Sequence, residues 1–305
     1  MLWVPITIAA AFLQTLRNAA QRGLAGQLSA LGATSTRFIF GFPFALLYCA
    51  ALFLSAGTKL PHFSTEFLVW VGGAALLQIL ATLCLLHLFK LRNFSSGVVL
   101  QKSEVLLVAL FGFAFLGDAI TLLSVLAIVA ATIGLLIVSG GKAWLNWRTF
   151  VSKPGMFGLG AGAGFAIAAV GYRAGSLSLT DQGLDFLRAA AMTLVVATFL
   201  QSVTLLIYLK LREPGQISAL FGAWRKSIIP GAAGAAASAC WFTASTLQIT
   251  AYVRMVGLIE ILFGFAFSAI RFGERPSKHE VVGATIMTLA ILVLLAERAG
   301  LIPAN

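Results

Sequence analysis

The sequence predicts an all-α integral membrane protein with ten transmembrane helices, arranged as two inverted repeats of five helices. Three observations lead to this fold class. Of the 305 residues, 60% are hydrophobic and 10% are charged, with a mean hydropathy of +0.97, whereas soluble proteins average about 25% charged residues. Apolar runs of roughly 20 residues, the length that crosses a bilayer, recur along the whole chain. The two halves of the chain also match each other at fixed offsets.

The ten helices are placed by apolar runs that are bounded by charged residues, Pro or Gly. Their predicted ranges are 3–22, 34–55, 67–88, 95–116, 119–139, 155–174, 183–209, 227–247, 250–271 and 279–297. The longest polar break is a linker at 140–153, where Trp144 and Trp147 suit the headgroup region. It separates a first repeat, 1–139, from a second repeat, 154–305. No basic segment precedes the first apolar run, so we expect the first helix to be retained.

The repeat rests on charged residues that recur at a common spacing. An offset of 156 places Glu104 on Glu260, and an offset of 151 places Arg37 on Arg188, so the second half has about five extra residues midway. The pentapeptide FGFAF also occurs twice, but its offset of 152 does not fit the acidic pair, and we attribute it to shared packing chemistry. With five helices per half, the second half enters the membrane from the opposite side, which is the inverted-repeat plan of many secondary transporters.

Each half closes with a short turn ending in Gly and an acidic residue, followed by a helix with regularly placed small residues. These turns contain Gly117 and Asp118 in FLGDAITLLS, and Gly273 and Glu274 in RFGERPSKHE. Both stretches resemble the closing motif of EamA repeats in the drug/metabolite transporter superfamily, and the helix count and linker position extend the resemblance over nearly the whole chain. We expect the glycines to allow the tight turn and the acids to have a structural role at the membrane edge.

The resemblance implies a ten-helix, gradient-driven carrier of small metabolites. Amino-acid exporters and nucleotide-sugar or sugar-phosphate antiporters are among the relatives, so it does not specify the substrate. Members of the family often have a proline near the start of the fourth and ninth helices, where this chain has Glu104 and Glu260.

Five ionisable side chains within the predicted spans are candidates for a functional role: Arg17, Lys102, Glu104, Arg254 and Glu260. Such residues cost about 2.5–3.5 kcal/mol each at a helix centre, so they normally face a cavity or one another. The long basic side chains could instead reach the membrane surface. The two glutamates lie about ten residues inside their predicted helices, which makes them candidates for proton coupling or for binding a substrate ammonium. The alternative is that each is a paired acid that only ties two helices together.

Uncharged polar residues follow one face of several predicted helices, which indicates either a common cavity or hydrogen bonds between helices. The predicted cavity residues are Gln14, Asn18, Gln78, Gln101, Lys102, Glu104, Trp241, Ser245, Gln248, Arg254 and Glu260. In this set Lys102 is the expected partner for a carboxylate or phosphate. Glycines at 158–164 and at 231–234 predict surfaces where helices approach closely.

The sequence lacks the residue patterns that other classes of function require. The histidines, His62, His87 and His279, are far apart and no nucleophile or metal motif is present, so we expect neither an enzyme nor a metal or cofactor. The net charge of +11 is spread along the chain, which argues against binding nucleic acid. We expect a secondary transporter, an exporter of small polar metabolites such as amino acids, in the bacterial inner (cytoplasmic) membrane. An exchanger of phosphorylated or nucleotide-linked solutes and a non-transporting sensor or scaffold remain as alternatives.

The membrane orientation is open at this point. Most of the 21 Lys and Arg residues fall on the side of the loops after helices 1, 3, 5, 7 and 9, and the positive-inside rule then places both termini outside the cytoplasm. The family resemblance implies that both termini are inside.

Overall fold

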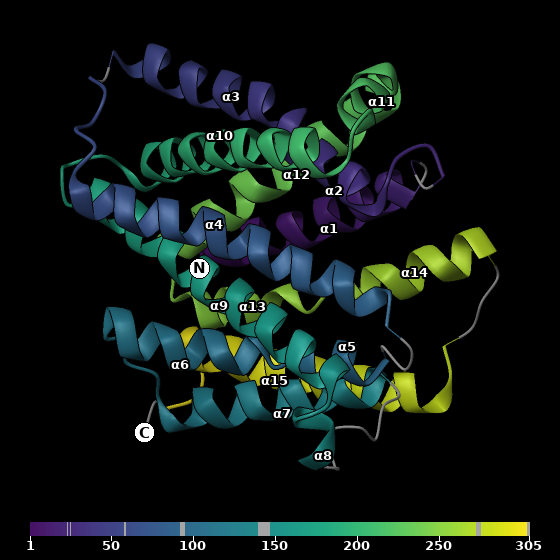
Figure 1. Cartoon of the computed structure of the whole chain (residues 1–305). Coiled ribbons are helices and arrows are strands. Elements are labelled where there is room, and N and C mark those ends of the chain that lie inside the picture. Colours follow the sequence, from purple (N-terminus) through teal and green to yellow (C-terminus); the bar gives the residue numbers. More distant parts are fainter. Residues whose placement is uncertain are drawn as a thin grey trace. The chain divides into compact units, whose positions relative to one another are not determined.

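The computed structural model describes residues 1–22, 24, 26–57, 59–91, 95–139, 147–272 and 276–303. These residues form fifteen helices, which Figure 1 follows along the chain, and the predicted all-α class is confirmed for them. Trp144 in the linker and the predicted motif residues Gly273 and Glu274 lie outside the described residues.

Seven described segments are long and apolar enough to cross a membrane, so the protein is a multi-pass membrane protein. They are Ala30–Ser55, Thr65–Phe89, Gly97–Leu116, Lys153–Thr180, Phe186–Arg212, Thr250–Ile270 and Lys278–Arg298. The other three predicted spans also contain helices: α1 (Trp3–Arg22), α7 (Leu122–Val138) and α12 (Trp224–Leu247). However, α7 has only 17 residues, α1 carries two arginines, and α12 is rich in Gly, Ala and Ser, which have low hydropathy. The arrangement with ten spans therefore stays a prediction.

The chain divides into two compact units, and each unit takes segments from both halves of the sequence. Unit 1 contains Met1–Val4, Leu77–Val170 and Gln248–Asn305, and unit 2 contains Pro5–Leu76 and Gly171–Leu247. The helices of unit 2 are α1, α2 (Ala30–Ile39), α3 (Gly41–Ala56), α10 (Phe186–Arg212), α11 (Gln216–Gly222) and α12. Those of unit 1 are α5 (Ser95–Gln101), α6 (Glu104–Leu116), α7, α8 (Trp147–Phe150), α13 (Thr250–Gly257), α14 (Glu260–Phe272) and α15 (Lys278–Arg298). Three helices contribute residues to both units: α4 (Thr65–Phe89), α9 (Lys153–Thr180) and α1, whose first two residues belong to unit 1.

Two of the predicted helices are interrupted in unit 1, each by a two-residue turn. Lys102 and Ser103 separate α5 from α6, and Leu258 and Ile259 separate α13 from α14. In both turns each amide donates to the carbonyl three residues earlier, at 3.1 Å in all four bonds. Helices α6 and α14 have 13 residues each, and their bounds correspond at the offset of 156 that matches Glu104 with Glu260. The interruption therefore recurs in the structure where the acids recur in the sequence.

These interruptions correct the prediction that both acids lie deep inside unbroken helices. Glu104 is the first residue of α6, and Glu260 is the first residue of α14. A third predicted helix, 34–55, is also divided, at Phe40, and it begins earlier than predicted, at Ala30. The side chain of Ser29 caps this start by accepting a hydrogen bond from the Gly32 amide at 2.9 Å. The prediction from hydrophobicity missed this helix start, because Ser29 is a polar residue outside the apolar run.

Glycines bring neighbouring helices into close contact inside each unit, as predicted for 158–164 and 231–234. A Cβ atom at Gly158 would lie 2.0 Å from the Gly97 carbonyl oxygen in unit 1, and one at Gly231 would lie 2.6 Å from the Phe40 Cβ atom in unit 2. Glycines face each other between α7 and α15, where a Cβ atom at Gly134 would lie 2.6 Å from the Gly283 carbonyl oxygen. Small residues at these points allow the backbones to touch, which is a common way for membrane helices to associate.

Candidate functional site

The predicted cavity residues are divided between the two units. Unit 1 contains Gln78, Gln101, Lys102, Glu104, Gln248, Arg254 and Glu260, and unit 2 contains Gln14, Asn18, Trp241 and Ser245. The two sets are therefore described separately. Within the described residues, no group of three or more His, Cys, Asp or Glu side chains is placed to hold a metal ion.

In unit 1 the interruption between α5 and α6 gathers an acid, a base and an amide, which we call the Glu104 cluster. The Gln101 Nε2 atom donates to Glu104 Oε2 at 3.0 Å, and Arg254 Nη1 lies 3.6 Å from Glu104 Oε1. Glu104 begins α6 and Arg254 lies in the last turn of α13, so each charge sits at the helix end that favours its sign. The side chains are 18% and 28% exposed, respectively, so the pair is partly accessible.

The other predicted residues of unit 1 lie on several elements. Lys102 is in the turn before Glu104, and Glu260 occupies the matching position at the start of α14. Gln248 follows α12, where its Oε1 atom accepts a hydrogen bond from the Ile249 amide at 2.9 Å. Gln78 lies on α4. The structure thus brings Gln101, Glu104 and Arg254 into direct contact.

In unit 2 the polar face of α1 makes hydrogen bonds to neighbouring helices. Trp241 Nε1 of α12 donates to Gln14 Oε1 at 3.1 Å, and Gln21 Nε2 donates to the Ala33 carbonyl of α2 at 3.1 Å. Arg17 Nη2 donates to the side-chain oxygen of Asn18 at 2.8 Å. For Gln14 and Gln21, these contacts favour the interhelical alternative that the sequence left open, and Ser245 is buried on α12.

Glu297 is a buried acid in unit 1 that was not among the predicted site residues. From the end of α15 its carboxylate accepts hydrogen bonds from the Thr121 hydroxyl and, at 2.6 Å, from the Ser124 hydroxyl. Thr121 is the N-cap of α7 and also accepts from the Ser124 amide at 3.2 Å. Glu297 therefore places a negative charge at the positive end of another helix. The sequence did not indicate this residue, because it belongs to no motif and lies at the end of a predicted span.

We expect Glu297→Ala to lower the free energy of unfolding by about 2–3 kcal/mol, because two hydroxyls lose a charged acceptor. Glu297→Gln keeps an acceptor oxygen and should have a smaller effect. Thermal unfolding of the purified variants in detergent measures this difference. Equal midpoints for the alanine variant and the wild type would contradict the role of Glu297 as a cap for α7.

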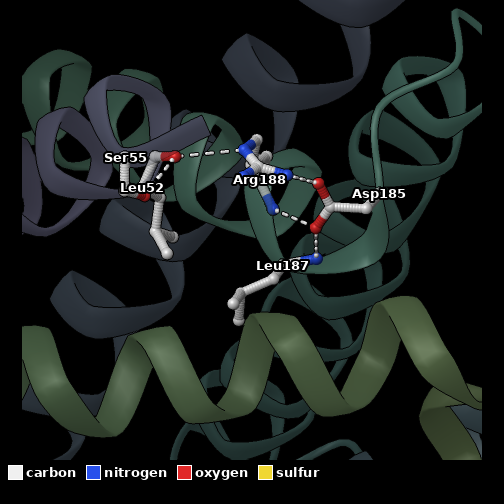
Figure 2. A network of polar contacts seen from close by, with 5 residues as sticks. All are labelled: Leu52, Ser55, Asp185, Leu187 and Arg188. Atoms are coloured by element: carbon white, nitrogen blue, oxygen red, sulfur yellow. Dashed lines mark hydrogen bonds and ion pairs between the residues drawn. The ribbon is translucent and has the colours of Figure 1, made fainter. Parts of the chain in front are cut away.

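Figure 2 shows a polar network in unit 2 that joins the start of α10 to the end of α3. Arg188 forms an ion pair with Asp185, and its Nε atom donates to the Leu52 carbonyl oxygen at 3.1 Å. Asp185 is the N-cap of α10 and accepts hydrogen bonds from the amides of Leu187 and Arg188. Partial burial raises the pKa of Asp185, but the hydrogen bonds and charge at Arg188 outweigh it and hold the pKa below its ordinary value of 3.8.

Arg37 was counted with the loop side for the charge bias, although it falls within the predicted helix 34–55, and the structure places it in the last turn of α2, within the span Ala30–Ser55. Arg188, its partner at an offset of 151, also lies inside a helix, α10. Arg188 was counted on the opposite side, together with the termini. Leaving both residues out therefore does not change the difference between the two sides, and the orientation stays open.

A cavity of about 300 Å³ lies in unit 1 between α14 and α15, and it is apolar. Its lining includes Leu262, Phe265, Pro276, Val281 and Leu289. The two threonines in its wall, Thr285 and Thr288, donate their hydroxyls to carbonyls of their own helix, at 2.9 and 2.8 Å. This cavity therefore presents little that would bind a polar solute.

Comparison with known proteins adds information on the fold. No protein-family model matches the chain, and no curated protein matches it. Among solved structures 28 chains match. One of these, described as a crystal structure of a protein, is 15% identical and aligns over 97% of this chain and 98% of its own length, with a TM-score of 0.70. At this identity the likeness shows the fold alone.

Proposed function

We propose that this protein is a secondary active transporter that exports small polar metabolites, such as amino acids, across the bacterial inner membrane. Transport proceeds by alternating access and is coupled to protons. The proposal includes the EamA-type architecture of two inverted five-helix repeats that the sequence predicts.

The observation that carries this proposal is the pair of interrupted helices in unit 1. Discontinuous membrane helices are common at the binding sites of secondary transporters, because an interruption leaves helix ends and backbone groups available inside the membrane. Here both second segments, α6 and α14, begin with a glutamate. A carboxylate at the positive end of a half-helix is suited to binding a proton or a substrate ammonium.

The contacts of Glu104 depend on its charge, which supports a role in coupling. The ionised carboxylate attracts Arg254 and accepts a hydrogen bond from Gln101. Protonation removes the attraction to Arg254 and leaves a weaker, neutral hydrogen bond. Because Arg254 belongs to α13 and Glu104 to α6, one proton changes the interaction between two helices. A proton can thus bias one arrangement of these helices over another.

Reconstitution of the purified protein into liposomes tests the proposal. Liposomes are loaded with labelled amino acids, and release is followed with and without a proton gradient. We expect release to exceed that of protein-free liposomes, and to fall when a protonophore removes the gradient. A matched panel of sugar phosphates tests the exchanger alternative, in which release requires an external counter-substrate. If folded protein moves none of these solutes, the non-transporting alternative replaces the proposal.

A further inference from the structure

Arg37 is a membrane-embedded cation whose hydrogen-bonding capacity is largely unused. It is the eighth residue of the span Ala30–Ser55, on the order of 10 Å from its start at 1.5 Å per residue. The residue is partly exposed, and its Nε atom is buried without a hydrogen-bond partner. Among the described residues Arg37 makes no ion pair, although its Cζ atom lies 4.3 Å from the ring centroid of Phe38. A ring face attracts the charge but satisfies few of the five N–H donors.

A second cation adds to the positive charge around Arg37. On α12, Gly234 is flanked by both arginines, since a Cβ atom there would lie 3.2 Å from the Cβ atom of Arg37 and 3.3 Å from the Cδ atom of Arg17. Arg17 is 9% exposed, and its charge repels that of Arg37. Two like charges in a low-dielectric region favour a bound anion.

The carboxylates of unit 2 lie elsewhere. Asp185 pairs with Arg188, and Glu213 accepts a hydrogen bond from the Ser29 hydroxyl. The other two, Glu66 and Asp181, are exposed near helix ends. The groups that act electrostatically on Arg37 are Arg17, whose charge repels it, and the Tyr172 hydroxyl, which attracts it, and none of the four carboxylates is among them. No carboxylate in the described part of unit 2 therefore pairs with Arg37.

The matched arginine in the second half provides an internal comparison. At the offset of 151, Arg188 matches Arg37, and Asp185 matches Thr34. Figure 2 shows that Arg188 is held by Asp185 and by the Leu52 carbonyl. Thr34 instead donates its hydroxyl to the Ala30 carbonyl at 2.8 Å and brings no negative charge. The first half thus retains the arginine without the acid that accompanies it in the second half.

We infer that Arg37 binds the carboxylate of a small organic anion or zwitterion. The guanidinium fork matches the two oxygens of one carboxylate, and the nearby charge of Arg17 strengthens the attraction. One guanidinium can satisfy both oxygens of a carboxylate, whereas a phosphate dianion presents more charge and more acceptors. The inference rests on the proposed function in that the bound anion is the transported solute. It assigns to Arg37 the recognition role that was expected of Lys102.

Binding to the purified protein in detergent tests the inference independently of transport. The probes are lactate, succinate, alanine, alaninamide, glycerol 3-phosphate and inorganic phosphate, and the measurement is the shift in thermal midpoint with concentration. We expect at least one carboxylate probe to stabilise the wild type, with alaninamide, which lacks the carboxylate, having no effect. Arg37→Gln should weaken that binding at least about tenfold, and Arg37→Lys should recover it only in part because it restores charge without the fork. Arg188→Gln is the control and should keep wild-type affinity.

Three results overturn the inference: no carboxylate probe binding, unchanged affinity in Arg37→Gln, or Arg37-dependent binding of the phosphate probes alone. If Arg37→Gln fails to fold, Arg37→Lys supplies the comparison, and wild-type affinity in that variant rules out bidentate recognition. Failure of the proposed function gives a different result. In that case the carboxylate probe binds through Arg37, but wild-type protein in liposomes does not release it.

Discussion

Glu104→Gln is expected to lower proton-driven solute release at least about tenfold while leaving the protein in the membrane. The substitution removes the titrating group and the partner of Arg254 at 3.6 Å, but keeps a side chain of the same size beside Gln101. Truncating one member of a buried charge pair costs about 2–5 kcal/mol. Because both side chains are partly exposed, we expect a cost in stability at the lower end of this range. The proton-driven rate should fall at least about tenfold, which corresponds to about 1.4 kcal/mol. Release from loaded liposomes, with and without the gradient, measures it.

A double variant distinguishes two roles of Glu104, proton coupling and a purely structural link between α6 and α13. Glu104→Gln with Arg254→Gln removes both charges, so it should restore the thermal stability lost in the single variant. Proton-driven release should stay low if Glu104 carries the coupling. Glu66→Gln, at an exposed acid in the first turn of α4, is the control and should transport normally. Full proton-driven release by the double variant would mean that the acid only ties two helices together.

Gly283→Val is expected to have the largest effect on folding. A Cβ atom at Gly283 would lie 2.5 Å from the Gly134 carbonyl oxygen and 2.7 Å from the Val138 amide nitrogen. Both are backbone atoms of α7, so no rotamer change can relieve the clash, and the helices must separate. Overpacking of a core costs about 1–3 kcal/mol even where side chains can adjust, so we expect a value at or above that range. The yield of monodisperse protein after detergent extraction and its thermal midpoint measure the loss.

Gly264→Ala is the matched control for this prediction. Gly264 lies in α14 of the same unit, and a Cβ atom there would meet nothing within 4 Å. Alanine is favoured over glycine inside a helix by about 0.8–1.0 kcal/mol, so this variant should be as stable as the wild type or more so. Wild-type stability of Gly283→Val would show that α7 and α15 do not approach each other as described.

The sequence predicted which residues belong to the candidate site, but not which of them contact one another. Glu104, Gln101 and Arg254 could be selected from the sequence because charged and polar residues are conspicuous in apolar runs. That Arg254 pairs with Glu104 could not be predicted, because 150 positions separate them and only the packing of α13 against α6 brings them together. The same holds for Glu297, which reaches the Thr121 hydroxyl across 176 positions.

The sequence by itself determined the membrane class, the positions of most helices and the matching of Glu104 with Glu260. Hydropathy and repeat offsets are properties of the chain and do not depend on how it folds. Only the tertiary structure decided that both acids begin new helices, and that Arg188 pairs with Asp185 while the Nε atom of Arg37 is buried without a hydrogen-bond partner. These features arise from turns, caps and contacts between distant segments. A charge in an apolar run is visible in the sequence, but its partner is decided by the packing of helices.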